Sequence, residues 1–389
     1  MLIGITGAPS KGKSTFFSAI TKIDVPISPR PFTTIEPNKG ATFITAKCPD
    51  KQFGLRCNPK NSKCIDGTRY VPINVVDLAG LVPGAHEGKG LGNKFLDSVR
   101  NADMLIQIVD VSGQTDLEGN PTEGADPAEE IRFLETEINE WIASILLKNW
   151  NKVKNRNLET IRQILTGLNV SADMIERVAD ELALSKERIQ WSDSEIKEFA
   201  KKIRERTLPI VVAANKIDLP GAKVKFEKLL KEFPDRKIFS VYADGELALR
   251  KASEKGLIKF NPDSSDFEIL SQNISQGQHS ALEKISKVLK ENGGSGVQKL
   301  LNTAVFDVLQ LITVYPVSDE HKLTDNFGNV LPDAIFVRKG TTALAFAEKI
   351  HTELAKSFLY AIDAKKKIRM AKDHELNDGD VIRIVSAAK

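Results

Sequence analysis

The sequence has little of what marks several classes of protein. Three cysteines in 389 residues exclude a disulfide scaffold, and no apolar run approaches the ~18 residues that a membrane-spanning helix needs. The 55 Lys and Arg residues face 52 Asp and Glu residues, for a net charge of +3. This balance excludes a polybasic nucleic-acid coat but allows a local basic face. Glycine (25) and proline (17) are too sparse for a collagen-like or low-complexity disordered chain.

The composition that remains is typical of a globular protein. Hydrophobic residues make up 41% and charged residues 28%, and at roughly 150 residues per domain the length suggests two or three domains. Met1 to Ile5 form a short apolar run that reaches Gly7 at once, without the basic start and cleavage site of a signal peptide. Cleavage by a signal peptidase in this segment would destroy the glycine-rich loop that begins at Gly7 and is described below. We therefore expect a cytoplasmic chain that does not associate with a membrane.

Short apolar runs alternate with helical stretches through the first half of the chain. Leu2–Thr6, Val71–Asp77, Met104–Val111 and Leu208–Ala214 are rich in β-branched residues and nearly unbroken, as buried parallel strands are. Strands that alternate with helices in this way predict an α/β fold with a mainly parallel sheet.

Residues 128–206 have a different character, helical and highly charged. Ile131, Leu134, Ile138 and Ile142 recur at three- and four-residue steps, which is typical of one face of a helix. We interpret this stretch as a helical insertion into an α/β domain made of residues 1–127 and 207–298. After the glycine-rich break at 293–296, residues 303–389 have the strand and helix pattern of a small β-grasp domain.

The clearest motif is a phosphate-binding loop. The sequence GxxxxGK[ST] is present, follows a predicted strand and opens a predicted helix, which is the context that this pattern requires. Glycines let the backbone wrap a phosphate chain, and the helix N-terminus favours negative charge. Lys13 would then reach the β- and γ-phosphates and Ser14 would bind Mg²⁺. The expected nucleotide contacts come from Gly7, Ala8, Pro9, Ser10, Lys11, Gly12, Lys13, Ser14 and Thr15.

Two further motifs follow predicted strands. Asp77-Leu-Ala-Gly80 lies at the end of a predicted strand. In P-loop proteins an acidic residue at this position holds Mg²⁺, and the N–H of the glycine contacts the γ-phosphate. In Asn215-Lys-Ile-Asp218, the carboxylate can accept two hydrogen bonds from guanine but is badly paired with adenine, and the stem of Lys216 can cover the ring. Asn215 and Asp218 therefore favour guanine.

Together these motifs carry a family resemblance. With Pro31–Asn38, Asp77–Ala85 and Gly88–Leu96, they resemble the Obg superfamily of translation-factor GTPases, and most closely its YchF-related branch. The C-terminal unit resembles a TGS domain, the ubiquitin-like β-grasp module of such GTPases and of threonyl-tRNA synthetases. The resemblance implies a Ras-like, Mg²⁺-dependent P-loop GTPase with a ribosome or RNA partner. It also implies that Thr34, with Thr33 as the alternative, is the switch threonine that binds Mg²⁺.

The region that contacts the base departs from the family pattern in two ways. YchF itself resembles an ATP-preferring protein with an altered base motif, whereas Asn215, Lys216 and Asp218 are intact here. The third base-contacting loop usually reads Ser-Ala, and the nearest match is Tyr242-Ala243. We expect the backbone N–H of Ala243 to reach the guanine O6 nonetheless.

The region that contacts the phosphates departs from the pattern in two ways as well. Ser10 replaces the Asn with which potassium-activated relatives help to hold K⁺, and Leu81 replaces the catalytic Gln of Ras-like GTPases. An apolar side chain cannot orient water, so catalysis must use another group, a partner or the γ-phosphate itself. His86 is a candidate, in the glycine-rich segment 84–92 that would reorder with nucleotide; the alternative is an exposed loop histidine.

The sequence thus predicts a slow GTPase switch that hydrolyses GTP to GDP and phosphate. Its catalytic residues would be Lys13, Thr34, Gly80 and His86, and its Mg²⁺ ligands Ser14, Thr34 and Asp77. We expect a monomer that has a ribosome or RNA as its partner. An activating protein is a possible further partner. One alternative is a small-molecule P-loop kinase, against which Asp218 argues. The other is a ribosome- or RNA-docking module in which nucleotide is structural and hydrolysis incidental.

Two groups of residues remain outside these motifs. Cys48, Cys57 and Cys64 are too widely spaced for the C-x₂₋₄-C pair common in closed zinc sites, and no His lies between them. We expect free thiols there. The basic run at 365–369 fits a solvated surface and an RNA-contacting face equally well, whereas the basic cluster at 148–156 favours a solvated surface.

Overall fold

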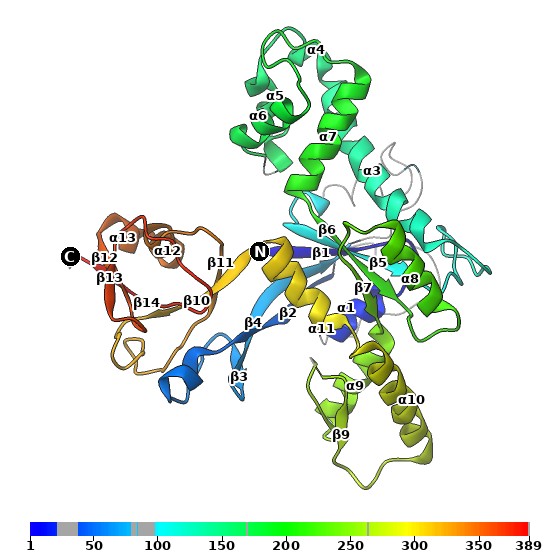
Figure 1. Cartoon of the computed structure of the whole chain (residues 1–389), viewed down its shortest axis with the longest axis vertical. Helices are drawn as coiled ribbons and strands as arrows, with labels where there is room; N and C mark the ends of the chain where they lie inside the picture. The colour runs from blue at the N-terminus through cyan, green and yellow to red at the C-terminus, as the bar shows by residue number, and fades with distance from the viewer. Residues whose placement is uncertain (22–37, 79–83, 85–97, 169, 263, 388–389) are drawn as a thin grey trace. The chain divides into compact units, whose positions relative to one another are not determined.

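The computed structural model describes residues 1–21, 38–78, 84, 98–168, 170–262 and 264–387. The chain divides into two compact units: unit 1 comprises Met1–Ala41 and Asn74–Leu300, and unit 2 comprises Thr42–Ile73 and Leu301–Lys389 (Figure 1). The sequence does not predict that residues 42–73 group with the C-terminal part of the chain.

A seven-stranded sheet carries the predicted motifs. Its order is β2-β4-β1-β5-β6-β7, with β3 beside β4, and β1 pairs in parallel with both β4 and β5. Ile5 lies opposite Asp77 in this register, so the loop after β1 and the end of β4 meet at one edge of the sheet, where α/β folds bind ligands. The strands are β1 (Leu2–Thr6), β2 (Asn38–Lys47), β3 (Lys63–Ile65), β4 (Thr68–Asp77), β5 (Met104–Asp110), β6 (Ile210–Asn215) and β7 (Ile238–Val241).

Unit 1 has helices between these strands, and the predicted α/β fold is confirmed. Buried Phe16, Phe17 and Ile20 give α1 its apolar face, and α1 packs against α9. The elements outside the insertion are α1 (Lys13–Thr21), α8 (Ala222–Glu232), α9 (Ala243–Glu254), β8 (Ile258–Phe260), β9 (Phe267–Ile269), α10 (Gln276–Asn292) and α11 (Val297–Thr303), whose last three residues belong to unit 2.

The charged stretch after β5 forms a helical subdomain around two long helices, α3 and α7, which run side by side (Figure 1). Ala128 and Ile131 of α3 pack in the core of the sheet, whereas Leu134 to Leu146 pack with the other helices. One helix therefore belongs to both cores. The helices are α3 (Pro127–Lys148), α4 (Trp150–Val153), α5 (Leu158–Ile164), η3 (Thr166–Leu168), α6 (Ala172–Glu181) and α7 (Asp193–Thr207).

Unit 2 contains a five-stranded sheet with the order β11-β10-β14-β12-β13, in which β10 and β14 are parallel and the other neighbours antiparallel. This is the β-grasp arrangement that the sequence predicts. The helical segment of this domain is two short helices, because extended backbone at His351 ends the first and caps the second. The elements are η1 (Pro49–Phe53), η4 (Ala304–Val308), β10 (Leu311–Val317), β11 (Ile335–Arg338), α12 (Ala343–Ile350), α13 (Thr352–Lys356), β12 (Phe358–Asp363), β13 (Ile368–Met370) and β14 (Val381–Ser386).

Among the described residues, none of the helices has the length and apolar content needed to span a bilayer.

Candidate nucleotide-binding site

The loop between β1 and α1 has a backbone that only glycine accommodates at two positions. Gly7 has φ +146°, and a Cβ there would lie 2.3 Å from the carbonyl oxygen of Ile108. Gly12 has φ +91°, and a Cβ would lie 2.4 Å from Nδ2 of Asn215. Because L side chains rarely adopt such angles, the two glycines set the curvature of the loop.

Lys13 and Asp77 influence each other electrostatically beside this loop. The Lys13 ammonium donates to the carbonyl oxygen of Ala8 at 2.9 Å, and burial lowers its pKa to about 8, although the nearby Asp77 carboxylate opposes the shift. Burial raises the pKa of Asp77 to about 6, again against the pull of Lys13. Buried groups of opposite charge with shifted pKa values are typical of functional sites.

Lys11, a residue of the same loop, has a structural role. Its side chain is fully buried and pairs with Glu130 of α3 at 2.8 Å. The ammonium also donates to the hydroxyl and carbonyl oxygens of Thr115 and to the carbonyl oxygen of Asp116. Lys11 thus ties the phosphate loop to the β5–α3 connection. The sequence analysis missed Glu130, although an acid on the apolar face of a helix is an available signal.

Asn215 links the loop to the base-contacting motif. Its amide donates to the carbonyl oxygen of Lys11 at 3.0 Å, and its side-chain oxygen accepts from the N–H of Ala243 at 3.2 Å. One buried side chain therefore holds the phosphate loop and the turn after β7 together. All three segments were predicted to meet at the nucleotide.

Lys216 is held by an acid that the sequence analysis did not identify. The ammonium of Lys216 donates to Asp110 at 2.8 Å. Burial opposes ionisation of Asp110, but hydrogen bonds from Lys216, Ser112 and Thr115 outweigh it and lower the pKa of this carboxyl. Asp110 ends the buried strand β5, so its position after an apolar run was the signal.

Asp218 and Tyr242 lie close together in the base-contacting region. Asp218 is exposed, with a pKa raised by partial burial of its carboxyl. Burial, together with the charges of Asp218 and Asp244, raises the pKa of Tyr242 to about 12. A Cβ at Gly245 would lie 2.3 Å from the Tyr242 ring, so the glycine makes room for the unusual tyrosine.

The glycine-rich break before α11 supports this turn. Ser295 is buried; its carbonyl oxygen accepts from the N–H of Tyr242 at 2.9 Å, and its hydroxyl donates to Glu246 at 2.6 Å. The break lies between α10 and α11 and is packed beneath the base-contacting turn.

Three family models match the chain. A 50S ribosome-binding GTPase model matches residues 2–152, an Obg-like GTPase YGR210-like G4 motif-containing domain matches 213–319, and a TGS domain matches 327–386. A GTP-binding protein of Methanocaldococcus jannaschii, described as uncharacterized, is 49% identical and aligns over all of both chains. This chain belongs to the Obg-like, YchF-type GTPases.

Two further relatives of this GTPase differ in what their names say of the nucleotide. A crystal structure of a GTP-binding protein from Pyrococcus horikoshii has a TM-score of 0.81 and 36% identity over all of both chains. The Obg-like ATPase 1 of Rattus norvegicus is 28% identical, over 92% of this chain and 81% of its own. The family therefore includes proteins named for either nucleotide.

Mg²⁺ is the cation that this family implies, and Asp77 fits it. The side chain is fully buried, and within the described part of the chain neither carboxylate oxygen has a hydrogen-bond partner. A buried carboxylate without partners is costly, and a divalent cation held by hard oxygen ligands would compensate it. Ser14, in the first turn of α1, supplies a hydroxyl of the same class.

Several predicted site residues of this GTPase lie outside the described residues: Thr33, Thr34, Gly80, Leu81 and His86.

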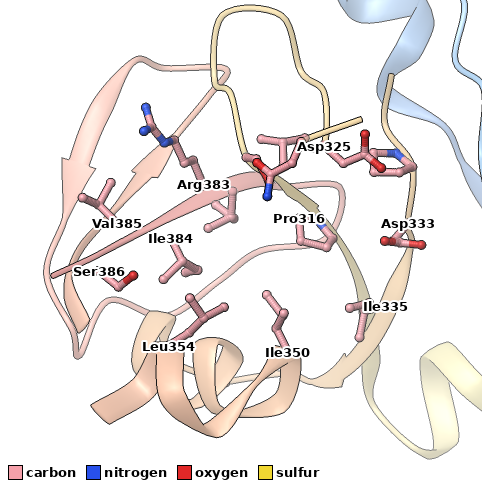
Figure 2. A pocket seen from close by; sticks show the side chains of 15 residues that line it. Pro316, Asp325, Asp333, Ile335, Ile350, Leu354, Arg383, Ile384, Val385 and Ser386 are labelled. Atoms are coloured by element: carbon pink, nitrogen blue, oxygen red, sulfur yellow. The ribbon is translucent and has the colours of Figure 1, made fainter. Parts of the chain in front are cut away.

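The TGS region of this GTPase has a pocket of about 470 Å³. Figure 2 shows Ile350 and Leu354, on the helical side, and Ile384 of β14 forming an apolar floor, with Asp333 and Arg383 at its edges. The pocket belongs to unit 2 and takes no part in the motifs of unit 1.

The basic run of the TGS region lies at the turn of the β12–β13 hairpin and the start of β13. Its residues 365–369 are all exposed. Lys366 pairs with Asp363 at 3.3 Å, and the Arg369 guanidinium lies 4.4 Å from the centre of the Tyr360 ring. Exposed Leu359 and Ile368 flank the charges. The hairpin therefore presents cations beside apolar and aromatic surface.

Proposed function

We propose that this protein binds Mg²⁺ and GTP at the P-loop and hydrolyses GTP to GDP and phosphate, as a slow cytoplasmic switch. The observation that carries the proposal is the convergence of three motifs on one sheet edge, with Asn215 bonded to both the phosphate loop and the base-contacting turn. Such a site couples phosphate state to base recognition.

The residues of the chain divide the work between them. The Lys13 ammonium and the loop N–H groups would neutralise charge that develops on the phosphates. Asp77, Ser14 and Thr34 would hold Mg²⁺, which would supply positive charge to neutralise the phosphates. Asp218 would accept from the guanine N1–H and 2-amino groups, and Lys216, fixed by Asp110, would cover the ring.

A calorimetric comparison of nucleotides tests the proposal. We expect the wild-type protein to bind GTP and GDP far more tightly than ATP and ADP, because only guanine pairs Asp218. Asp218→Asn should weaken GTP and favour xanthine nucleotides, whose C2 oxygen accepts a hydrogen bond. Asp235→Asn removes an exposed carboxylate elsewhere and should change neither affinity. Equal affinities for ATP and GTP in the wild type would refute guanine selection.

We also propose a ribosome or RNA partner, engaged through the β12–β13 hairpin. Arg and Lys neutralise phosphate, and aromatic and apolar surface suits unstacked bases. The second candidate function is a docking module in which nucleotide only sets the state of the protein; Leu81 favours it, because this residue cannot position water. Co-sedimentation with ribosomal subunits, compared between GDP and a non-hydrolysable GTP analogue, tests both.

A further inference from the structure

Three cysteines, nine and seven residues apart in the sequence, meet at one point in unit 2. Cys48 precedes η1, Cys57 lies in the loop after it, and Cys64 is in β3. Their sulfurs and a carboxylate oxygen of Asp50 all lie within 4.8 Å of one another. None of these three cysteines forms a disulfide, and their convergence with an acid was not predicted.

Three of the six distances between these atoms are close to the edges of a tetrahedron around one zinc ion, and the other three are within 4.8 Å. With Zn–S near 2.3 Å and Zn–O near 2.0 Å, tetrahedral ligands lie about 3.8 Å apart for two sulfurs and about 3.5 Å for sulfur and oxygen. Cys48 Sγ lies 3.7 Å from Cys57 Sγ. Asp50 Oδ2 lies 3.4 Å from Cys57 Sγ and 3.7 Å from Cys64 Sγ.

The surroundings orient these four groups. The second oxygen of Asp50, Oδ1, accepts the N–H of Lys51 at 2.7 Å, which leaves Oδ2 toward the sulfurs. The fully buried Arg69 donates to Cys48 Sγ at 3.4 Å and to the carbonyl oxygen of Leu331 at 2.9 Å. Outer partners of this kind hold metal ligands in place.

Charge and softness favour zinc over other occupants. Binding of Zn²⁺ would displace the thiol protons, and its charge, with that of the adjacent Arg69, would compensate the ligands, of which Cys48 and Asp50 are buried. Thiolates select Zn²⁺ over hard cations, and four ligand atoms this close leave room for one ion rather than an iron–sulfur cluster.

We propose that Cys48, Asp50, Cys57 and Cys64 form a structural zinc site. All four positions are taken by protein ligands, which is typical of structural rather than catalytic zinc. The site would fasten the η1 loop to β3 and, through Arg69, to Leu331 of the C-terminal part of unit 2. It is independent of the nucleotide site and of the proposed GTPase activity.

Metal analysis of the full chain tests this proposal. Protein purified without chelators should contain about one zinc per chain by mass spectrometry, and the cobalt-substituted protein should show the visible absorption of tetrahedral thiolate ligation. Cys57→Ser and Asp50→Asn should each weaken zinc binding at least tenfold. The matched control is Asp66→Asn: Asp66 is an exposed acid in the adjacent hairpin turn at φ +49°, a conformation that Asn also tolerates, and zinc binding should not change.

Three results would overturn the proposal. They are zinc affinity equal in Asp50→Asn and the wild type, an intact mass that reveals a disulfide among the three cysteines, and bound iron with iron–sulfur absorption. GTP affinity, measured on the same samples, separates loss of zinc from loss of the whole fold, since unit 1 should still bind nucleotide.

Discussion

At the scale of single residues, two lysines of the phosphate loop have different roles. Lys11 is buried in an ion pair with Glu130 and Lys13 lies beside Asp77. Removal of one partner from a buried pair leaves an uncompensated charge, which costs about 3 kcal/mol or more. We therefore expect Lys11→Ala to lower the free energy of unfolding by that amount. Lys13 is only half-buried, so Lys13→Ala should abolish GTP turnover with little change in stability.

Urea unfolding without nucleotide and single-turnover hydrolysis check this pair of variants. The double variant Lys11→Met with Glu130→Leu removes both charges and should recover most of the lost stability. A Lys11→Ala protein as stable as the wild type would contradict the structural role of this lysine.

Glu130 makes stability depend on pH. Burial raises the pKa of Glu130 to about 7, against the opposing effect of Lys11, from an ordinary value of 4.5. Between these values the native state holds a proton that the unfolded chain releases, so this group lowers stability as pH rises. Gln does not titrate. The free energy of unfolding of Glu130→Gln, relative to that of the wild type, should therefore increase as pH rises from 4.5 to 7. The increase should be at most about 3 kcal/mol.

Urea unfolding at pH 5 and pH 8 measures this difference. Glu129→Gln serves as the control, because Glu129 is exposed on the same helical turn and its variant should follow the wild type. A difference between Glu130→Gln and the wild type that stays constant with pH would show that Glu130 is ionised throughout.

At the scale of elements, the phosphate loop depends on a close approach between segments. A Cβ at Gly12 would meet the Asn215 amide, which bonds the loop to the turn after β7. We expect Gly12→Ala to weaken GDP binding more than tenfold, because the substitution strains the backbone and displaces Asn215. Isothermal calorimetry measures this affinity.

Gly256→Ala is the matched control for that substitution. Gly256 also has a positive φ, +68°, but a Cβ there would meet no atom within 4 Å. It should cost about 1–2 kcal/mol of stability and leave GDP affinity unchanged. Equal affinities in the two variants would mean that strain alone, not displacement of Asn215, governs the loop.

At the scale of the whole molecule, we expect the isolated protein to be a slow GTPase. Leu81 replaces the water-orienting Gln, so the rate should be that of unassisted Ras, about 10⁻⁴ to 10⁻³ per second. Single-turnover assays measure it. His86→Ala distinguishes a built-in catalytic group, which predicts a large fall, from a partner or the substrate itself, which predicts none. Several turnovers per second in the free protein would rule out a partner-dependent switch.

The partner surface can be tested with two basic clusters of the same chain. Lys365→Glu, Lys367→Glu and Arg369→Glu together should abolish co-sedimentation with ribosomal subunits, since they reverse the exposed hairpin charge. The exposed cluster at 148–156 provides the control: Lys148→Glu, Lys152→Glu and Lys154→Glu should have little effect. The opposite result would move the partner surface to the helical insertion.

The sequence by itself determined the elements and the motifs. Strand β1, the phosphate loop and the start of the long helix α3 lie where pattern and turn chemistry predict them, because these signals are local. Asp77, Asn215 and Asp218 could be singled out for the same reason: each follows an apolar strand whose end must reach the edge of a parallel sheet.

Only the tertiary structure decided which distant residues meet. The bond between Lys11 and Glu130, the support of Lys216 by Asp110 and the packing of Ser295 beneath Tyr242 join segments about 50 to 120 residues apart. The Cys48, Asp50, Cys57 and Cys64 cluster lacks any standard spacing and arises because η1, a loop and β3 fold onto one point. Spacing along a chain encodes contacts within one helix or turn, whereas contacts between elements depend on how the chain packs in space.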